Sequence, residues 1–482
     1  MGLWGNVIFP EHHIDSLIDL EDEFIHPYIP NSVPSIKKEM LEAIGAKSTD
    51  ELYAEMIPDR LLLNREMRLP EPLPDELGLK RHVAGILAKN KTTDEYISFL
   101  GGGCWQHYIP KVCEVIQSRS EFLTAYAGGV YSDQGRYQAN FEFQSLICEL
   151  LGMEVSGLPT YDWGAAAGNS VRMASRITGR KEILVPKNMS PARLSILRNF
   201  CSSVDPNGGI KITQVDYEDE TGRVDLGDLE SKLGEEIACV YFENPNYLGV
   251  IESEGAKISE LAHAYGAESV VGVDPISLGV LASPAEYGAD IACGEAQPLG
   301  VSMYAGGGSC GFIASRDEER YVAEYPLRLL SIAPTTVEGE YGFGQALYAR
   351  TSYMAREKAK DWVGTTTVLW GITAAVYMSL LGPTGMKELG ETILEKSHYA
   401  AEILDDIPGA FVPYRGFFKE FPVVFSKPAE EVNKQLLKYG IFGGSPLTDY
   451  PEMGQSALYC VTEMHNLEMI QRLESALREV LA

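Results

Sequence analysis

Short apolar runs alternate with longer polar or amphipathic stretches between residues 182 and 314, and this alternation constrains the fold more than any other feature. The runs cover residues 183–185, 210–215, 237–242, 269–273, 289–292 and 310–314. Strands that alternate with helices form a mostly parallel sheet with helices on both faces. With 482 residues, of which 45% are hydrophobic, the chain is long enough to bury such a sheet and a second, smaller domain.

A carboxylate ends one of these runs, at Asp274, and the next run enters a Gly-rich stretch. That stretch reads Gly294-Glu295-Ala296-Gln297-Pro298-Leu299-Gly300 and continues to Gly306-Gly307-Gly308. Large α/β enzymes built on pyridoxal phosphate (PLP) present an Asp to the pyridinium nitrogen and then the lysine that holds the cofactor. Here the sequence has no lysine between Lys257 and Lys358. The pattern therefore predicts a PLP-enzyme framework without its covalent anchor.

We expect three parts along the chain. Residues 1–98 read as an N-terminal extension and a helical arm that packs on something else. Its helices are expected over 36–44, after Ser48 and over 82–89, with a Pro-rich connector before the last. A large α/β domain is expected over 99–350. Linking helices and a small C-terminal α/β domain are expected over 351–482.

Within the C-terminal part, apolar patterning predicts strands over 421–425 and 458–461. It predicts helices over 429–438 and 467–481, preceded by helices over roughly 351–363 and 368–381. The apolar stretch 363–381 fits a buried helix better than a membrane span, because it carries Thr365, Thr366 and Thr367 together with glycines.

Two loops supply candidate site residues. His107 lies in the first, and Tyr126, Gln134 and Gly135 lie in the second, while Gly306 to Gly308 offer backbone N–H donors. His107 has a second interpretation, as a hydrogen-bonded anchor of its loop. Asp274 likewise either faces a pyridinium or is a structural turn residue.

A turn of small residues over 161–170 leads into a helix and has two interpretations. Small residues expose backbone N–H groups at a helix N-terminus, where a phosphate can be accepted. They also allow close helix packing. The sequence leaves both open.

Several function classes are disfavoured. A net charge of −28 and a pI near 4.7 argue against binding nucleic acid through its phosphates. The eight cysteines form no C-x-x-C pair and lack histidines at zinc spacing, so reduced thiols and no metal are expected. Gly306 to Gly311 match G-x-G-x-x-G by letter, but a strand follows instead of a helix, which disfavours NAD binding.

Many segments, in one order from about Tyr28 to the C-terminus, carry a family resemblance. They include Tyr28-Ile29-Pro30-Asn31, His107-Tyr108-Ile109-Pro110, Phe141-Glu142-Phe143-Gln144, Asn244-Pro245-Asn246, Asp274-Pro275-Ile276-Ser277-Leu278-Gly279, Gly294 to Gly300, Gly443-Gly444-Ser445-Pro446-Leu447 and Cys460-Val461-Thr462-Glu463. On these the chain resembles glycine dehydrogenase (decarboxylating) subunit 1. That protein is the α-subunit of the split P-protein of the glycine cleavage system.

The resemblance implies a PLP-dependent transferase fold of type I, similar to aspartate aminotransferase. It implies that a homologous β-subunit holds PLP covalently and that the two subunits form an α2β2 assembly. It also implies that the pocket of this chain is vestigial, with Gln297 about where the lysine would be. It also implies glycine decarboxylation, with transfer of the aminomethyl group to the lipoyl carrier H-protein, and a cytoplasmic location away from membranes.

Three segments depart from the family pattern: 127–133, 163–169 and 351–362. They leave two alternatives beside glycine decarboxylation. One is a paralogous subunit of a split PLP enzyme that acts on a different amino acid. The other is a non-catalytic structural or regulatory partner.

Overall fold

The computed structural model describes residues 25–123, 134–203, 208–304, 310–360 and 367–482, apart from residues 64, 66 and 74. It divides into two compact units, Met1–Asn90 and Lys91–Ala482. The division lies eight residues before the predicted border at 98/99. Ile97 and Ser98 belong to the second unit because they form β1 and pair in parallel with β13 (Ile441–Phe442).

The first unit consists of short helices joined by turns. Its α-helices are α1 (Pro34–Ile44), α2 (Thr49–Met56) and α3 (Glu76–Leu87). Gly45, at a φ of 77°, ends α1 as predicted, and the Ser48 side chain accepts from the Glu51 N–H at the start of α2. The third helix begins six residues earlier than predicted because Asp75 caps it. None of the residues described in this unit is buried.

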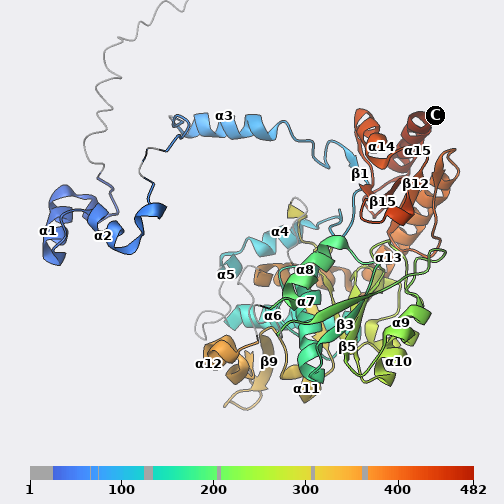
Figure 1. Ribbon diagram of the computed structural model, residues 1–482, viewed down its shortest axis with the longest axis horizontal. Helices are drawn as coiled ribbons and strands as arrows, with labels where there is room; N and C mark the ends of the chain where they lie inside the picture. The colour runs from blue at the N-terminus through green and yellow to red at the C-terminus, as the bar shows by residue number, and fades with distance from the viewer. Residues whose placement is uncertain are drawn as a thin grey trace, which may run out of the picture. The chain divides into compact units, whose positions relative to one another are not determined.

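The second unit is built on a seven-stranded sheet in the order β2-β8-β7-β6-β5-β3-β4 (Figure 1). The strands are β2 (Val155–Ser156), β3 (Glu182–Pro186), β4 (Lys211–Val215), β5 (Ile237–Asn244), β6 (Glu268–Val273), β7 (Ile291–Glu295) and β8 (Gly311–Ser315). Neighbours from β7 to β4 run parallel, and β8 is antiparallel to both β7 and β2. All six predicted strands are present, so the predicted mostly parallel α/β sheet is confirmed.

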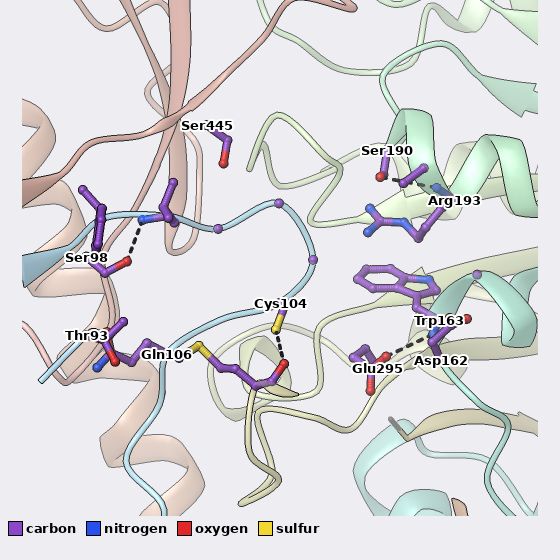
Figure 2. A pocket seen from close by; sticks show the side chains of 18 of the residues that line it. Thr93, Ser98, Cys104, Gln106, Asp162, Trp163, Ser190, Arg193, Glu295 and Ser445 are labelled. Carbon is purple, nitrogen blue, oxygen red and sulfur yellow. Dashed lines mark hydrogen bonds between the residues drawn. The ribbon is translucent and has the colours of Figure 1, made fainter. Parts of the chain in front are cut away.

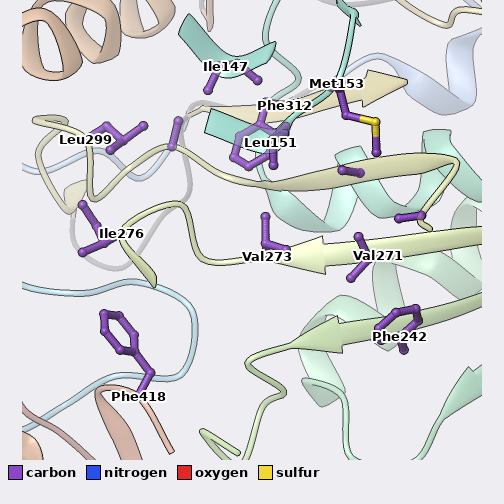
Figure 3. Close-up of a cluster of buried hydrophobic side chains, with 14 of the residues drawn as sticks. Ile147, Leu151, Met153, Phe242, Val271, Val273, Ile276, Leu299, Phe312 and Phe418 are labelled. Atoms are coloured by element: carbon purple, nitrogen blue, oxygen red, sulfur yellow. The ribbon is translucent and has the colours of Figure 1, made fainter. Parts of the chain in front are cut away.

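Each face of this sheet packs into its own apolar core. Along β6, Val271 and Val273 join the core drawn in Figure 3, while Val270 joins the core on the other face. This alternation follows from the two-residue period of a strand. The first core includes side chains of α6 (Gln134–Leu151), α10 (Gly255–Ala264) and α13 (Val368–Asp405), and the second those of α7 (Trp163–Thr178) and α8 (Pro191–Cys201). Helices therefore cover both faces.

A smaller antiparallel sheet has the order β11-β12-β15-β14. It is formed by β11 (Ala410–Phe411), β12 (Glu420–Phe425), β14 (Ser445–Pro446) and β15 (Ser456–Cys460), and its helices are α14 (Ala429–Leu436) and α15 (Leu467–Leu481). The strands and helices predicted over 421–481 are all present. The predicted border at 350/351 stays a prediction.

Of the two predicted linking helices, the second is present and the first is shorter than predicted. The second, predicted over 368–381, is present and continues as α13 to Asp405, with a kink where Gly382 has a φ of 60°. The first is shorter than predicted, because Arg356 at a φ of 53° ends α12 (Ser352–Ala355). By length and composition α13 is apolar enough to cross a membrane, but many of its side chains belong to the first core, as a buried core helix requires.

Gly249, in the segment after β5 of the large sheet, lies against the start of β12 in the small sheet. It has a φ of 80°, and a Cβ atom built on it would lie 1.8 Å from the backbone carbonyl oxygen of Glu420. Any larger residue must therefore move the start of β12, which belongs to the small sheet.

Gly249→Ala should lower the free energy of unfolding by about 3 kcal/mol or more, because it adds a backbone clash to an unfavourable φ. Gly339→Ala is the matched control: its φ is 82°, but nothing lies within 4 Å of the added methyl group. The control should lose about 1 kcal/mol. Urea unfolding of both variants measures the difference, and equal losses would contradict the close approach.

Candidate functional site

Two buried carboxylates lie at the carboxyl ends of neighbouring parallel strands, where open α/β sheets bind ligands. Glu243 stands near the end of β5, and Asp274 follows β6. Each is paired with a buried cation. Arg193 donates from Nε and Nη2 to Glu243 at 2.8 and 2.7 Å, and Lys419 Nζ lies 2.8 Å from Asp274 Oδ2. Only 2% of Lys419 and 3% of Asp274 is exposed.

Lys419 is the centre of a network that joins three parts of the second unit. It directly precedes β12 of the small sheet and contacts Asp274 of the large one. Its Nζ also lies 3.1 Å from Nε2 of His107 and 3.6 Å from the centre of a Trp105 ring. Nδ1 of His107 in turn lies 2.8 Å from Glu463, which follows β15. The loop of residues 99–110 is thus held between the two sheets.

Glu463 has an altered pKa because of its partners in this network. Burial opposes its charge, but the adjacent His107 and the Tyr108 N–H that donates to it outweigh burial and lower its pKa to about 2. The carboxylate is therefore ionised throughout the neutral and mildly acidic range.

Asp274 and His107 match the structural interpretations of the sequence. Oδ1 of Asp274 accepts from the Ile276 N–H at 3.1 Å, which makes it a turn residue, while Oδ2 faces Lys419. His107 is buried and connects Lys419 to Glu463, so it anchors its loop.

Gln297 is buried and fully engaged by backbone groups. Its Oε1 accepts from the Trp105 N–H at 3.1 Å, and its Nε2 donates to the carbonyl oxygens of Trp105 and Val301 at 3.1 and 3.0 Å. The side chain expected at the anchor position therefore holds Trp105 in place, and the ring of Trp105 covers Lys419.

A carboxylate also lies at the N-terminus of α7. Oε2 of Glu295 accepts from the Trp163 N–H at 3.1 Å, and Oε1 accepts from the backbone N–H groups of Gln297 and Cys310 at 3.0 and 3.1 Å. Burial raises the pKa of Glu295 to about 8, and these three donors act in the opposite direction. Asp162 caps the same helix by accepting from the Ala165 N–H.

The small residues at the start of α7 serve close packing. A Cβ atom at Gly164 would lie 2.6 Å from Ile196, and one at Gly168 would lie 2.5 Å from Phe200, both side chains of α8. Of the two interpretations of residues 161–170, the structure supports helix packing.

A cavity of about 640 Å³ lies beside this cluster (Figure 2). Arg193 and Trp163 stand on one side of it, with the guanidinium 4.1 Å from the centre of the Trp163 ring, and the loop with Cys104 stands on another. The space next to Asp274 is different. Between Trp105, Trp163, Asp274 and Lys419 only about 10 Å³ remains, which is at the lower limit for one water molecule.

These residues do not fit PLP. The cofactor requires a carboxylate facing its ring nitrogen and a lysine for its aldehyde carbon. Here the carboxylate of Asp274 is paired with Lys419, position 297 holds a glutamine, and only about 10 Å³ of space remains beside Asp274.

Among the other predicted site residues, Gly135 is not part of this network. Gly135 lies near the start of α6 and is exposed, and α6 begins at Gln134. Tyr126 and Gly306 to Gly308 lie outside the described residues. No group of His, Cys, Asp or Glu side chains in the described part of the chain is arranged to hold a metal ion.

Sequence reasoning missed Lys419, Arg193 and Trp105 as parts of the site. Glu295 and Glu463 stood within segments that carried the family resemblance, and this was a usable signal. Lys419 offered none, because its partner Asp274 lies far away in the sequence and only the packing of the two sheets brings them together.

Comparisons with known proteins agree with this architecture. The family model for the glycine cleavage system P-protein matches residues 26–476. A probable glycine dehydrogenase (decarboxylating) subunit 1 from Pyrococcus abyssi is 40% identical over 459 residues, covering 94% of this chain and 99% of the relative. The protein of the same name from Staphylothermus marinus is 37% identical over 472 residues, covering 95% and 98%.

Solved structures give the same result for the fold. A crystal structure of an inhibitor-bound glycine decarboxylase (P-protein) has a TM-score of 0.81 and 35% identity, covering 95% of this chain and 100% of that one. A sphingosine-1-phosphate lyase from Burkholderia pseudomallei has a TM-score of 0.62 at 14% identity, covering 89% and 94%, and a NifS-like protein is also similar. The predicted type I fold of PLP-dependent transferases is confirmed.

Glu463→Gln should alter the acid stability of the protein. Because the folded pKa of about 2 is below the ordinary value of 4.5, ionised Glu463 contributes stability above pH 4.5 that is lost as the pH falls towards 2. That contribution is about 3 kcal/mol. The variant should be less stable at pH 7, and its free energy of unfolding should fall less steeply between pH 4.5 and 2.

Urea unfolding at a series of pH values measures this effect. Glu260→Gln is the control, since Glu260 pairs with Lys257 at the surface and its side chain is 70% exposed. The control should follow the wild-type curve. A Glu463→Gln curve parallel to the wild type would show that Glu463 is not held by the network.

Proposed function

This chain belongs to the glycine cleavage system P-protein family, and from that premise we propose that it is the α-subunit without a cofactor lysine of a PLP-dependent glycine decarboxylase. In this proposal the complex decarboxylates glycine and transfers the aminomethyl group to the lipoyl carrier H-protein. The cofactor is bound covalently by a homologous β-subunit, and the complex is cytoplasmic.

The observation that carries the proposal is the state of the anchor position. Gln297 is buried and bonded to backbone groups, and the sequence has no lysine between Lys257 and Lys358. Lys419 lies near Asp274, but its ammonium is already paired with that carboxylate and covered by Trp105. This supports placing the cofactor and its lysine on another chain.

The first unit supports the need for a partner subunit. Ile36, Met40 and Ile44 recur every four residues on one face of α1 and are exposed in the described unit. None of the residues described there is buried, so the arm has no core of its own. Relatives named subunit 1 match nearly the whole chain, the arm included. We infer that the arm packs on the β-subunit, in an α2β2 assembly.

The contribution of this chain to glycine decarboxylation is structural in this proposal. It completes and shapes the active site of its neighbour across the subunit interface and supplies no catalytic group through its own closed pocket. The cavity beside Arg193 and Trp163 is also lined by Glu295, and the proposal assigns it no step of the reaction.

The proposal predicts activity for the complex and none for the chain alone. The purified chain with added PLP should show no Schiff-base absorbance and no spectral change with borohydride. The complex with its β-subunit should exchange the glycine carboxylate with labelled CO2. As the control, a complex whose β-subunit carries Ala in place of its cofactor lysine should assemble but show no exchange.

The alternatives give different results in the same assays. An intact complex without glycine exchange indicates a paralogue that acts on another amino acid. A β-subunit that has full activity alone indicates a structural or regulatory partner. Covalent PLP on the isolated chain, with decarboxylation by that chain, would overturn the assignment of the lysine to the β-subunit.

A further inference from the structure

We propose that Lys419 and Glu295 take two binding positions of the cofactor: Lys419 replaces the cation that would face Asp274, and Glu295 replaces the acceptor at the start of α7, so that the space beside Asp274 is closed by side chains of this chain. The proposal concerns this chain alone and goes beyond the proposed function, since it does not depend on which partner or substrate the complex has.

The first position is that of the cation beside Asp274. PLP enzymes present an Asp at this strand end to a protonated ring nitrogen. Here the Lys419 ammonium lies 2.8 Å from the Asp274 carboxylate, and only 2% of the Lys419 surface is exposed to solvent. The ring of Trp105 lies over the ammonium at 3.6 Å and shields it further from water.

The second position is that of the hydrogen-bond acceptor at the N-terminus of α7. The N-terminus of a helix binds phosphate through its free backbone N–H groups and its dipole. Here the carboxyl group of Glu295 accepts the Trp163 N–H and two further backbone N–H groups. A side chain of this protein therefore occupies the acceptor position at the start of this helix.

Gln297 connects Glu295 to Trp105, the residue that covers Lys419. Its backbone N–H donates to Glu295, and its side chain bonds both backbone groups of Trp105, whose ring covers Lys419. A continuous series of contacts therefore leads from Glu295 through Gln297 and Trp105 to Lys419, which is paired with Asp274. Only about 10 Å³ is left beside Lys419, whereas Glu295 and Trp163 line the cavity of about 640 Å³.

A buried carboxylate without a cation is strongly unfavourable, whereas a buried ion pair replaced as a whole by neutral groups is close to neutral in free energy. Asp274 would be such a lone charge if neither a cofactor nor Lys419 faced it. The pair therefore fixes the loop of residues 99–110 and the start of β12 against the large sheet.

The first test restores only the anchor. Full-length Gln297→Lys is incubated with PLP, reduced with borohydride and digested, and the adduct at position 297 is quantified by mass spectrometry. Gln297→Met, of similar size without the amine, is the matched control, and thermal melting verifies that both variants fold. We expect no adduct at position 297 above background, and stoichiometric labelling there would overturn the proposal.

The second test is a double-mutant cycle on the ion pair. Lys419→Met and Asp274→Asn should each lower the melting temperature, and the double variant should recover more than half of the larger loss. Lys387→Met with Glu391→Gln is the control cycle, because that pair is exposed, and it should show no coupling. Additive losses at Lys419 and Asp274 would overturn the proposal. The cycle uses the chain alone, so its failure would leave the assignment to a glycine decarboxylase unaffected.

Discussion

The ion pair between Lys419 and Asp274 is the interaction on which the arrangement of the second unit depends. Both groups are almost fully buried, so each has lost its hydration and is stable only because the other is present. The pair joins the end of β6 to the start of β12, and His107 extends it to Glu463 beyond β15. The charges thus add to backbone hydrogen bonds between the same parts, in which the Ile251 N–H donates to Gly416 and the Phe418 N–H donates to Gly249, with the loop of residues 99–110 held between the two sheets.

The network around Lys419 does not fill the space at the strand ends evenly. On the side of Asp274 almost no space remains, whereas on the side of Arg193 and Trp163 a cavity of about 640 Å³ persists. The difference follows from what each acid faces. Glu243 is paired with Arg193, whose guanidinium lies 4.1 Å from the centre of the Trp163 ring, and Arg193 and Trp163 line the open cavity. Asp274 is neutralised by a lysine that enters the space itself.

Much of the fold could be predicted because it follows from local patterns. The six strands of the large sheet were visible as apolar runs, and Gly45 and Ser48 marked helix ends through their caps. The shortened helix near residue 356 could not be predicted, since Arg356 adopts a positive φ that its sequence neighbours do not indicate. The same applies to Ile97, whose pairing with β13 depends on a segment distant in sequence.

The site was predictable only as an absence. The lack of a lysine between residues 257 and 358 is a property of the sequence, and the family resemblance put Gln297 near the place of the missing lysine, which stays a prediction. What replaced the cofactor could not be inferred, because ion pairs between residues far apart leave no local pattern. Gln297 and Asp274 were therefore identified while Lys419 was missed, although Lys419 determines what Asp274 does.

Losing a cofactor places a physical demand on a scaffold of this kind. A strand end that presents a buried carboxylate and a helix N-terminus that presents free N–H groups are both unsatisfied once the cofactor is gone. Removing the lysine alone would leave both in place, and the buried charge would weaken the contact between the sheets. A chain that keeps Asp274 and the start of α7 must therefore supply a cation and a hydrogen-bond acceptor of its own. Lys419 and Glu295 meet that demand at the two positions where it arises.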